Sequence, residues 1–300
     1  MRPRHRGCVA TIGNYDGLHL GHRQVLEQLV GRARQLDLPA LVMCFEPTPQ
    51  EFFVGGEAPP RLSSFRDKFD QLADCGVDRF LCVRFDEALS VMSADDFIKV
   101  LLVEGIGVKH LVVGDDFRFG HHREGNFSTL VEAGEQYGFD VMDTASFKVD
   151  NERVSSTLIR NALIAGELGR AARMLGRRYS MSGRVTRGDQ LGRQLGYPTA
   201  NIRPGRWRPP LEGVFAVRVE GLGEPKDAVA NLGTRPTVDG RELLLEVHIF
   251  DFDKDIYGQR IRVEFLAHLR NETRFDDIGT MKRQMDLDAD KARQILSATA

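Results

Sequence analysis

The sequence has no long hydrophobic run and almost no net charge. No window approaches the 18 consecutive apolar residues of a membrane span, so we expect no membrane partner. The opening "MRPRHRGCVATIG" is basic but leads directly into a strand pattern, without the apolar segment of a secretory signal, which predicts a cytoplasmic protein. A formal charge of −2 leaves no global basic field, so we expect small-molecule substrates and no nucleic-acid partner.

Cysteine is also scarce. No two of the 4 cysteines have the CxxC spacing, and two of them lie within the apolar runs "LVMCF" and "RFLCV". Buried free thiols in a reducing compartment explain this pattern better than disulfides or a zinc site.

The chain is long enough for two domains. Its 300 residues exceed one typical core, and 42% apolar with 28% charged residues is an ordinary globular composition. The pattern of predicted strands and helices changes near residue 180, and no low-complexity linker separates the two halves. We therefore predict one domain over residues 1–180 and a second over 181–300.

The first half alternates strand and helix patterns. Short apolar runs, "CVATI", "ALVMCF", "FLCVRF" and "HLVVG", are separated by helix-period segments such as "GHRQVLEQLVGRARQL". This is the pattern of βα units around a mostly parallel sheet, so we predict an α/β domain. Two further helical segments, near 157–165 and 168–176, lead to the domain boundary.

The second half reads mainly as strands. Five strand patterns follow one another without an intervening helix, which predicts an antiparallel sheet or small barrel. They lie near 179–186, 214–220, 228–232, 243–250 and 260–269. The last segment, from Phe275 to about Leu296, has apolar residues at helical spacing and is predicted to pack on this sheet.

The stretch "TIGNYDGLHLGH" places two histidines at the start of a predicted helix. His19 and His22 share one face of its first turn, where free N–H groups and the helix dipole attract phosphate. Imidazoles there can donate hydrogen bonds to developing phosphate charge. The other interpretations are surface histidines or a metal site, but a metal needs a third ligand that the local sequence does not offer.

Two other segments of the first half could meet a nucleotide. "VSSTLIR" offers hydroxyls and Arg160 at the mouth of a helix, which suits a triphosphate, although Ser155 or Ser156 could simply cap that helix. "VVGDDFRFG" presents aromatic residues beside an arginine after a strand. That suits a planar ligand, although Phe117 and Phe119 could equally be core residues.

In the second half, "GRVTRGDQLGRQLGYPTANI" interleaves glycine and arginine after a strand. It is not a Walker motif, but it is a reasonable flexible cover for ATP phosphates. Thr199 and Asn201 follow Pro198, and in an extended segment their oxygens point the same way. Two such oxygens with phosphate would hold Mg²⁺.

A carboxylate lies on a predicted strand further along. In "ELLLEVHIF" the alternation puts Leu245 and Val247 on one face, and Glu246 with His248 on the other. Glu246 is a candidate general base for a substrate hydroxyl. The alternative is an exposed strand residue paired across the sheet.

Together these motifs resemble those of the prokaryotic bifunctional riboflavin kinase/FMN adenylyltransferase (FAD synthetase) family. The matching segments, in the family's order and over nearly the whole chain, are "GNYDGLHLGH", "FEPTP", "GDDFRFG", "VSSTLIR", "GRVTRGDQLGRQLGYPTANI", "GVFAVRV", "NLGTRPTV" and "EVHIFDFDKDIYG". The pair "GYPTAN" and "EVH" is specific to the flavokinase module.

The resemblance implies an α/β Rossmann-like nucleotidylyltransferase domain, then a six-stranded antiparallel riboflavin kinase barrel with a C-terminal helix. The second domain would phosphorylate riboflavin to FMN with MgATP. The first would adenylylate FMN to FAD and release pyrophosphate. The FMN phosphate is already an anionic nucleophile, so the adenylyl step would need no base.

The residue roles follow the same resemblance, read onto this sequence. The resemblance implies that the catalytic residues are Glu246, His19, His22 and Arg160. It implies that ATP and phosphate are bound by Gly13, Asn14, Asp16, Gly17, Ser155, Ser156, Thr157, Gly188, Arg193 and Gly196. It also implies that the flavin is bound by Asp116, Phe117 and Arg274, and Mg²⁺ by Thr199 and Asn201.

The sequence departs from the family pattern at three places. Tyr15 stands where the family commonly has Phe, Thr48 where it usually has His, and Leu158 where a polar or basic residue is frequent. These changes concern the efficiency of the adenylyl site.

Two other functions compete with this assignment. A class I aminoacyl-tRNA synthetase relative would share "HLGH", but the strand-rich second half does not suit a helical anticodon-binding domain. A non-enzymatic flavin-binding module would use glycine loops and aromatics but would not need Glu246 or the histidine pair. The sequence leaves open whether the chain forms a homo-oligomer.

Overall fold

A computed structural model describes residues 6–114, 116–144, 147–188, 192, 195–204, 208–237 and 240–299. The chain forms two compact units. The first contains Met1–Pro59 and Lys68–Ser155, and the second contains Pro60–Asp67 and Ser156–Ala300.

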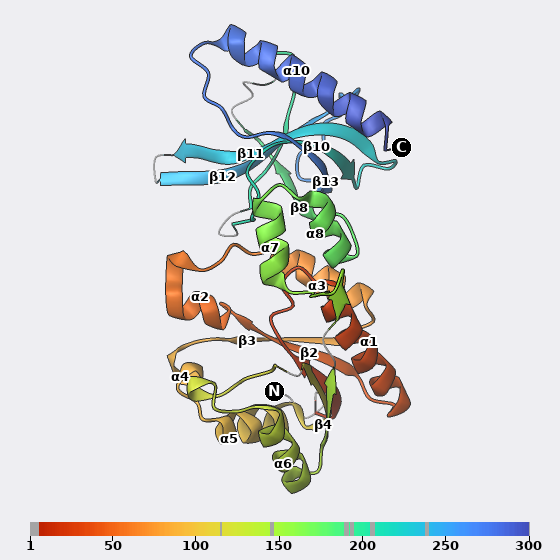
Figure 1. Cartoon of the computed structure of the whole chain (residues 1–300), viewed down its shortest axis with the longest axis vertical. Coiled ribbons are helices and arrows are strands. Elements are labelled where there is room, and N and C mark those ends of the chain that lie inside the picture. Colours follow the sequence, from red (N-terminus) through yellow and green to blue (C-terminus); the bar gives the residue numbers. More distant parts are fainter. Residues whose placement is uncertain are drawn as a thin grey trace. The chain divides into compact units, whose positions relative to one another are not determined.

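The first unit is built on a five-stranded parallel sheet (Figure 1). Its order is β3-β2-β1-β4-β5, with β1 and β4 as central neighbours. The strands are β1 (Cys8–Ile12), β2 (Ala40–Glu46), β3 (Arg79–Arg84), β4 (Val108–Gly114) and β5 (Asp140–Thr144). The first four are the predicted apolar runs, whereas β5 was not predicted because its sequence "DVMDT" is too polar to show as an apolar run.

Helices cover both faces of this sheet. Leu26 and Leu29 of α1 (Leu20–Gln35) and Leu72 of α3 (Phe65–Asp74) share one buried cluster with Val9 and Val42. The opposite face is covered by the π-helix Phe97–Ile106 and by α6 (Phe127–Tyr137). Burial on both sides is what a parallel sheet requires.

The smaller elements are α2 (Pro49–Val54), α4 (Glu87–Ser90), α5 (Ala94–Asp96), two 3₁₀ turns (Gly55–Glu57 and His121–Arg123) and the hairpin β6 (Lys148–Val149) with β7 (Glu152–Arg153).

The second unit is a closed six-stranded barrel in the order β10-β11-β12-β9-β8-β13, with antiparallel neighbours. The strands are β8 (Ser180–Thr186), β9 (Ala200–Ile202), β10 (Gly213–Glu220), β11 (Lys226–Thr237), β12 (Gly240–Ile249) and β13 (Arg260–Arg270). Five match the predicted strand patterns. The sixth, β9, is too short for a pattern of its own. The antiparallel barrel is thereby confirmed.

Helices α7, α8 and α10 belong to the described part of the barrel unit. The terminal α10 (Ile278–Ser297) packs Ala292 and Leu296 against Val214 and Ala216 on the outside of β10. The helices α7 (Ser156–Ile164) and α8 (Leu168–Leu175) precede the barrel, and α8 packs beside β13. The compact units thus divide after Ser155, while the domain boundary at 180/181 stays a prediction.

All four cysteines are free thiols. Cys8 and Cys44 are buried, and burial raises the pKa of each thiol to about 12. Cys75 is half-buried and Cys82 is exposed. Within the described ranges, no helix has the length and apolar character needed to cross a bilayer.

Candidate active sites

The loop between β1 and α1 is a tight turn at the carboxyl edge of the parallel sheet. Tyr15, Gly17 and Leu18 have φ angles of 49°, 82° and 40°, in the left-handed region that non-glycine residues rarely adopt. The Tyr15 hydroxyl lies 2.7 Å from the Thr11 hydroxyl, which anchors the turn to β1. A side chain at Gly13 would meet the Tyr15 ring, since an added Cβ would lie 3.1 Å from it.

The turn leads directly to the histidine pair. His19 is the N-cap of α1, and its Nδ1 accepts a hydrogen bond from the His22 backbone N–H at 3.2 Å. The two rings stack with centroids 3.6 Å apart and planes 14° from parallel. Because its Nδ1 is an acceptor, a neutral His19 carries its proton on Nε2 and can donate there.

His22 is electrically neutral near pH 7. Burial holds its pKa well below the usual histidine value, and the neighbouring His19 and Lys68 side chains lower it further. Its Nδ1 is buried without a hydrogen-bond partner in the described part of the chain. Across the same residues, no three His, Cys, Asp or Glu side chains are placed to hold a metal ion. The pair therefore offers N–H donors to a ligand at the amino end of α1.

Four predicted phosphate-binding residues lie in this turn: Gly13, Asn14, Asp16 and Gly17. Asn14 is exposed and Asp16 is buried, so the turn presents one polar side chain to solvent and folds the other inward. The adjacent strand β4 ends at the same edge, because β1 and β4 are parallel. Ligands of open parallel sheets bind at such an edge.

The two predicted flavin contacts of this unit follow β4. Asp116 forms an ion pair with Arg153 at 2.8 Å. The Phe117 ring stacks on Phe119 at 5.5 Å and packs against the core. Phe117 therefore has a packing role, and flavin binding by these residues stays a prediction.

The motif "VSSTLIR" spans the division between the units. Ser155 ends the first unit, and α7 begins at Ser156 in the second. Arg160 lies on α7 and donates from Nε to the Pro60 carbonyl oxygen at 2.7 Å. The grouping of Arg160, the two serines and Thr157 with the histidine pair stays a prediction.

Helix α2 was overlooked in the sequence. It follows the carboxyl end of β2 and exposes 66% of Phe53, whose ring lies edge-on to Phe52 and Phe85. The two adjacent aromatic residues in "EFF" were the feature of the sequence that could have drawn attention to this segment. Thr48, the departure from the family pattern, caps α2: its hydroxyl accepts from the Glu51 N–H at 3.3 Å, and Glu51 accepts from the Thr48 N–H at 2.8 Å.

In the barrel, two predicted residues lie opposite each other. Asn201 of β9 and Glu246 of β12 are register partners on neighbouring antiparallel strands. The Glu246 side chain is 21% exposed and forms an ion pair with Arg235 of β11. The carboxylate therefore faces solvent beside Asn201, on the face of β12 opposite the buried Leu245 and Val247.

Asn201 meets the requirements of a metal ligand. It is 5% exposed, and its Oδ1 is buried without a hydrogen-bond partner among the residues described. An unpartnered carbonyl oxygen is a ligand type that Mg²⁺ accepts. Thr199 precedes it by two residues, and its carbonyl accepts from Asn201 Nδ2 at 3.5 Å. The backbone at Gly188 lies so close to Asn201 that a Cβ added to Gly188 would be 2.5 Å from Asn201 Nδ2.

The glycine-rich loop is described in part. Gly188, Gly192 and Gly196 are described, whereas Arg193 lies outside the described residues. Gly196 has a φ of 87°, which favours glycine. Arg187 places its guanidinium 5.3 Å from the centre of the Tyr257 ring.

Polar residues of β11 complete the surroundings of Glu246. Asn231 is its register partner on β11, and Asn231 Nδ2 donates to Glu272 at 3.0 Å. Asn231, Arg235 and Glu272 carried only an unspecific signal in the sequence, because strand alternation does not say which strands become neighbours. Arg274, a predicted flavin contact from the same loop as Glu272, is exposed.

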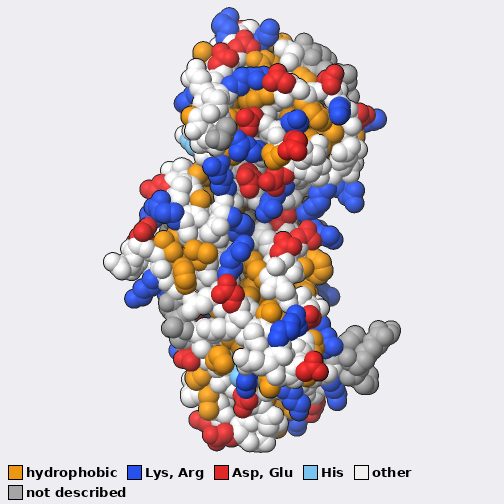
Figure 2. All heavy atoms as spheres, turned by 90° about the vertical axis from the view of Figure 1, so that its right-hand side faces the viewer, with side chains coloured by type: hydrophobic (Ala, Val, Ile, Leu, Met, Phe, Trp, Pro, Cys, Tyr) orange, Lys and Arg blue, Asp and Glu red, His pale blue; other side chains and the backbone are white. Residues whose placement is uncertain are grey.

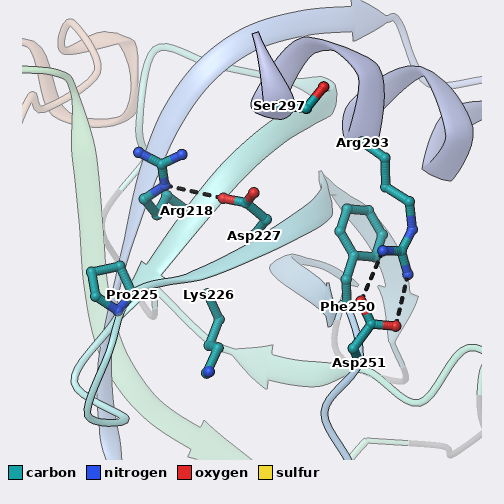
Figure 3. A pocket seen from close by; sticks show the side chains of 8 residues that line it. All are labelled: Arg218, Pro225, Lys226, Asp227, Phe250, Asp251, Arg293 and Ser297. Carbon is teal, nitrogen blue, oxygen red and sulfur yellow. Dashed lines mark hydrogen bonds and ion pairs between the residues drawn. The ribbon is translucent and has the colours of Figure 1, made fainter. Parts of the chain in front are cut away.

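The barrel unit also has a hollow of about 650 Å³ next to the end of α10 (Figure 3). Its lining residues are Arg218, Pro225, Lys226, Asp227, Phe250, Asp251, Arg293 and Ser297. Two ion pairs, Arg218–Asp227 at 3.0 Å and Arg293–Asp251 at 2.9 Å, satisfy most of its charges internally. No residue predicted to bind ATP, flavin or Mg²⁺ is among these lining residues, so Asn201 and Glu246 define the candidate site.

Comparison with known proteins finds a matching family model for each half of the chain. The FAD synthetase family model matches residues 1–158, and the riboflavin kinase family model matches residues 175–296. A bifunctional riboflavin kinase/FMN adenylyltransferase of Escherichia coli (strain K12) is 48% identical over 294 residues, covering 98% of this chain and 94% of the relative. One from Pseudomonas fluorescens is 46% identical, covering 100% of this chain and 96% of the relative.

A solved structure agrees with the fold. A crystal structure described as a macrolide-efflux protein from Streptococcus pneumoniae is 29% identical, with a TM-score of 0.80, covering 98% of this chain and 95% of that chain. The chain thus belongs to the family of bacterial bifunctional riboflavin kinase/FMN adenylyltransferases. The family, the fold class and the expectation of an enzyme with two activities are confirmed.

Proposed function

We propose that the barrel unit phosphorylates riboflavin to FMN and that the α/β unit adenylylates FMN to FAD, with ATP as co-substrate of both steps. Riboflavin, FMN and ATP are the small molecules that family membership implies. The observation that carries the kinase assignment is the placement of Glu246 directly opposite Asn201 on neighbouring strands.

In the kinase step, Glu246 accepts the proton of the ribityl 5′-hydroxyl as its oxygen attacks the γ-phosphorus of ATP. The bond from that phosphorus to the bridging oxygen breaks, and ADP leaves. The Arg235 ion pair holds the carboxylate in place. Asn201 and Thr199 would hold Mg²⁺, which supplies charge neutralisation for the phosphates. Catalysis is otherwise mostly positioning of the two substrates.

In the adenylyl step, a phosphate oxygen of FMN attacks the α-phosphorus of ATP, and pyrophosphate leaves. No general base is needed, because the nucleophile is already an anion. His19 and His22 donate hydrogen bonds to the phosphate oxygens, supported by their stacked rings at the amino end of α1. Arg160, Ser155, Ser156 and Thr157 add donors to the triphosphate.

For the flavin, exposure favours Phe53 as a contact in addition to Asp116 and Phe117. Its ring follows the carboxyl end of β2 and is two-thirds exposed, so a planar ligand can reach its face. In the barrel, Arg274 is the proposed flavin contact. The free buried thiols of Cys8 and Cys44 support a reducing compartment such as the cytoplasm.

A chromatographic time course tests the proposed function. Riboflavin incubated with ATP, Mg²⁺ and the purified chain should give FMN first and FAD after a lag. Chelation of Mg²⁺ should stop FMN formation. FMN without FAD would refute the adenylyl half, and FAD made only from added FMN would refute the kinase half.

A further inference from the structure

The candidate metal ligands Thr199 and Asn201 lie in segment 198–201, which begins just before strand β9 and includes its first two residues. Pro198 opens this segment and Tyr197 precedes it. Proline has no backbone N–H, so the chain cannot be held by a donor at this position. The placement of the segment therefore depends on hydrogen bonds to its carbonyl oxygens and on the side chains around it.

His248 holds the segment from the side of β12. Its Nδ1 donates a hydrogen bond to the Pro198 carbonyl oxygen at 2.9 Å, because a carbonyl can only accept. Alternation along β12 puts His248 on the same face as Glu246, two residues earlier. Burial holds the pKa of His248 below its usual value, so the ring is neutral near pH 7. One strand thus carries both the proposed base and a donor to the segment of the metal ligands.

Tyr197 holds the segment from the side of α10. Its hydroxyl donates a hydrogen bond to the carboxylate of Asp286, near the middle of α10. Burial and this carboxylate raise the pKa of Tyr197 to about 12, so the hydroxyl keeps its proton. The Tyr197 ring lies edge-on to His248, with the centroids 4.8 Å apart, and packs against the cluster between α10 and β10. The two hydrogen bonds therefore act on adjacent residues of the chain.

Helix α10 is a fixed support for this contact. The Asp288 carboxylate, only 6% exposed, accepts hydrogen bonds from Nη2 and Nε of Arg270 on β13 at 2.7 and 2.9 Å. Further along the helix, Ala292 and Leu296 are fully buried against the barrel. Asp286 is two residues before Asp288, so it belongs to a part of α10 that the barrel holds tightly.

Contacts within the segment pass its placement on to Asn201. The Thr199 carbonyl accepts from Asn201 Nδ2 at 3.5 Å, and Oδ1 of the same amide has no partner within the described residues. The Thr199 backbone follows the Pro198 carbonyl directly, so a shift of that carbonyl also turns the Asn201 amide. Glu246 lies opposite Asn201 in register, and displacements of about 1 Å in a catalytic site can cost about 100-fold in rate.

We propose that Tyr197, His248 and Asp286 are positioning residues of the kinase site. They hold segment 198–201 so that the oxygens of its candidate Mg²⁺ ligands face Glu246, and they act through this segment rather than on the reacting atoms. The inference rests on the proposed function, because it takes the segment as the Mg²⁺ site. Loss of such supporting partners lowers metal affinity or activity by about 10- to 100-fold.

Conservative variants separate positioning from packing. Tyr197→Phe and His248→Phe keep an aromatic ring and remove the hydrogen bond, whereas His248→Asn keeps a donor near the position of Nδ1. In FMN formation, each Phe variant should raise the Mg²⁺ concentration for half-maximal rate by about tenfold, and His248→Asn should recover part of the loss. FAD formation from added FMN should stay unchanged, because the proposed adenylyl site belongs to the other unit.

A double-variant cycle tests the hydrogen bond between Tyr197 and Asp286. Tyr197→Phe and Asp286→Ala remove the two ends of one bond, so the double variant should need no more Mg²⁺ than either single variant. Asp286→Asn keeps an acceptor and should need less Mg²⁺ than Asp286→Ala.

Asp290→Ala is the matched control for Asp286→Ala. It removes an exposed carboxylate from the same helix, one turn later, and leaves the Tyr197 hydrogen bond in place. Side chains of both charges are intermingled over the face of the molecule in Figure 2, so the loss of one such charge is a small change. We expect Asp290→Ala to match the wild type.

Hydrogen exchange without metal or nucleotide gives a second readout. Amides of residues 199–202 should exchange about fivefold faster in Tyr197→Phe and His248→Phe, while the amides of β10 and β13 keep their protection. If a Phe variant does not fold, Asp286→Ala, at an exposed site, carries the same test.

Two outcomes would overturn the inference. One is a Mg²⁺ requirement equal to that of the wild type in both Phe variants, even with a lower kcat. The other is unchanged exchange at residues 199–202. A wild-type chain that forms no FMN would refute the proposed function instead, and the exchange measurement, which needs no turnover, would still test the positioning of the segment.

Discussion

A glutamate on a surface strand is usually an ordinary exposed residue, and Glu246 differs from that case through its neighbours. Asn201 lies opposite it with a buried, unpartnered amide oxygen, and Arg235 pairs with its carboxylate. The same reasoning applies to His22, which is neutral because it is buried beside two other basic groups. Each role depends on the surroundings of the side chain more than on its type.

The neutral state of His22 predicts a pH dependence of stability. Burial lowers its pKa in the folded chain below the value of about 6.5 expected in the unfolded chain. Below pH 6.5 the unfolded state therefore binds more protons than the folded state, and stability falls as the pH falls. The slope approaches about 1.4 kcal/mol per pH unit while only the unfolded histidine is protonated.

Thermal unfolding between pH 7 and pH 5 checks this expectation. The His22→Gln variant should lose less stability than the wild type over this interval, because it has no histidine to protonate at this position. His122→Gln, at an exposed site, is the matched control and should follow the wild type. Parallel curves for all three proteins would show that His22 titrates normally in the folded chain.

Among the helices, α2 depends on its cap. It has six residues, too few for stability by helix propensity alone, and the reciprocal bonds of Thr48 and Glu51 satisfy its amino end. Thr48→Ala removes the acceptor for the Glu51 N–H and should favour local opening of α2 by about 1 kcal/mol. Amide exchange at Glu51 should then become about fivefold faster in hydrogen-exchange measurements.

Thr48→Ser keeps the hydroxyl and should retain the protection of the wild type. FAD formation should fall in Thr48→Ala if exposed Phe53 of α2 contacts the flavin, because opening of the helix displaces the ring. Equal exchange in the Ala and Ser variants would mean that the cap contributes nothing to α2.

Strand β9 shows where prediction of elements reached its limit. The longer barrel strands could be located from alternation, because one face of each is buried. β9 has only three residues, and all of them are buried, so it carries no alternation to detect. Its pairing with β12 nevertheless places Asn201 opposite Glu246. In the first unit, β5 was missed for a different reason, because its sequence is too polar to show as an apolar run.

Across the whole chain, two groups of active residues belong to two compact units. The histidine pair lies in the first unit, and the Asn201–Glu246 pair lies in the second. Glu246→Gln keeps the size of the side chain but cannot accept a proton. It should reduce FMN formation by about 10²- to 10⁴-fold while conversion of added FMN to FAD continues.

The reverse pattern is expected for His19→Ala, which should accumulate FMN from riboflavin and make little FAD. A mixture of the two variants should produce FAD from riboflavin again, because FMN released by one protein can bind the other. Chromatography of the three reactions checks this. Loss of both activities in either variant would show that the two groups of residues do not act separately.

The local pattern of the sequence determined the α/β half, the strand-rich half, the terminal helix and the motifs that place His19, His22, Asn201 and Glu246 on particular elements. These features depend on short-range periodicity and on residue type. Only the tertiary structure decided that β9 and β12 are neighbours, that Arg235 reaches Glu246, and that Tyr197 reaches Asp286 of α10. Such contacts join residues far apart in the chain, and they depend on strand order and packing, which local periodicity does not encode.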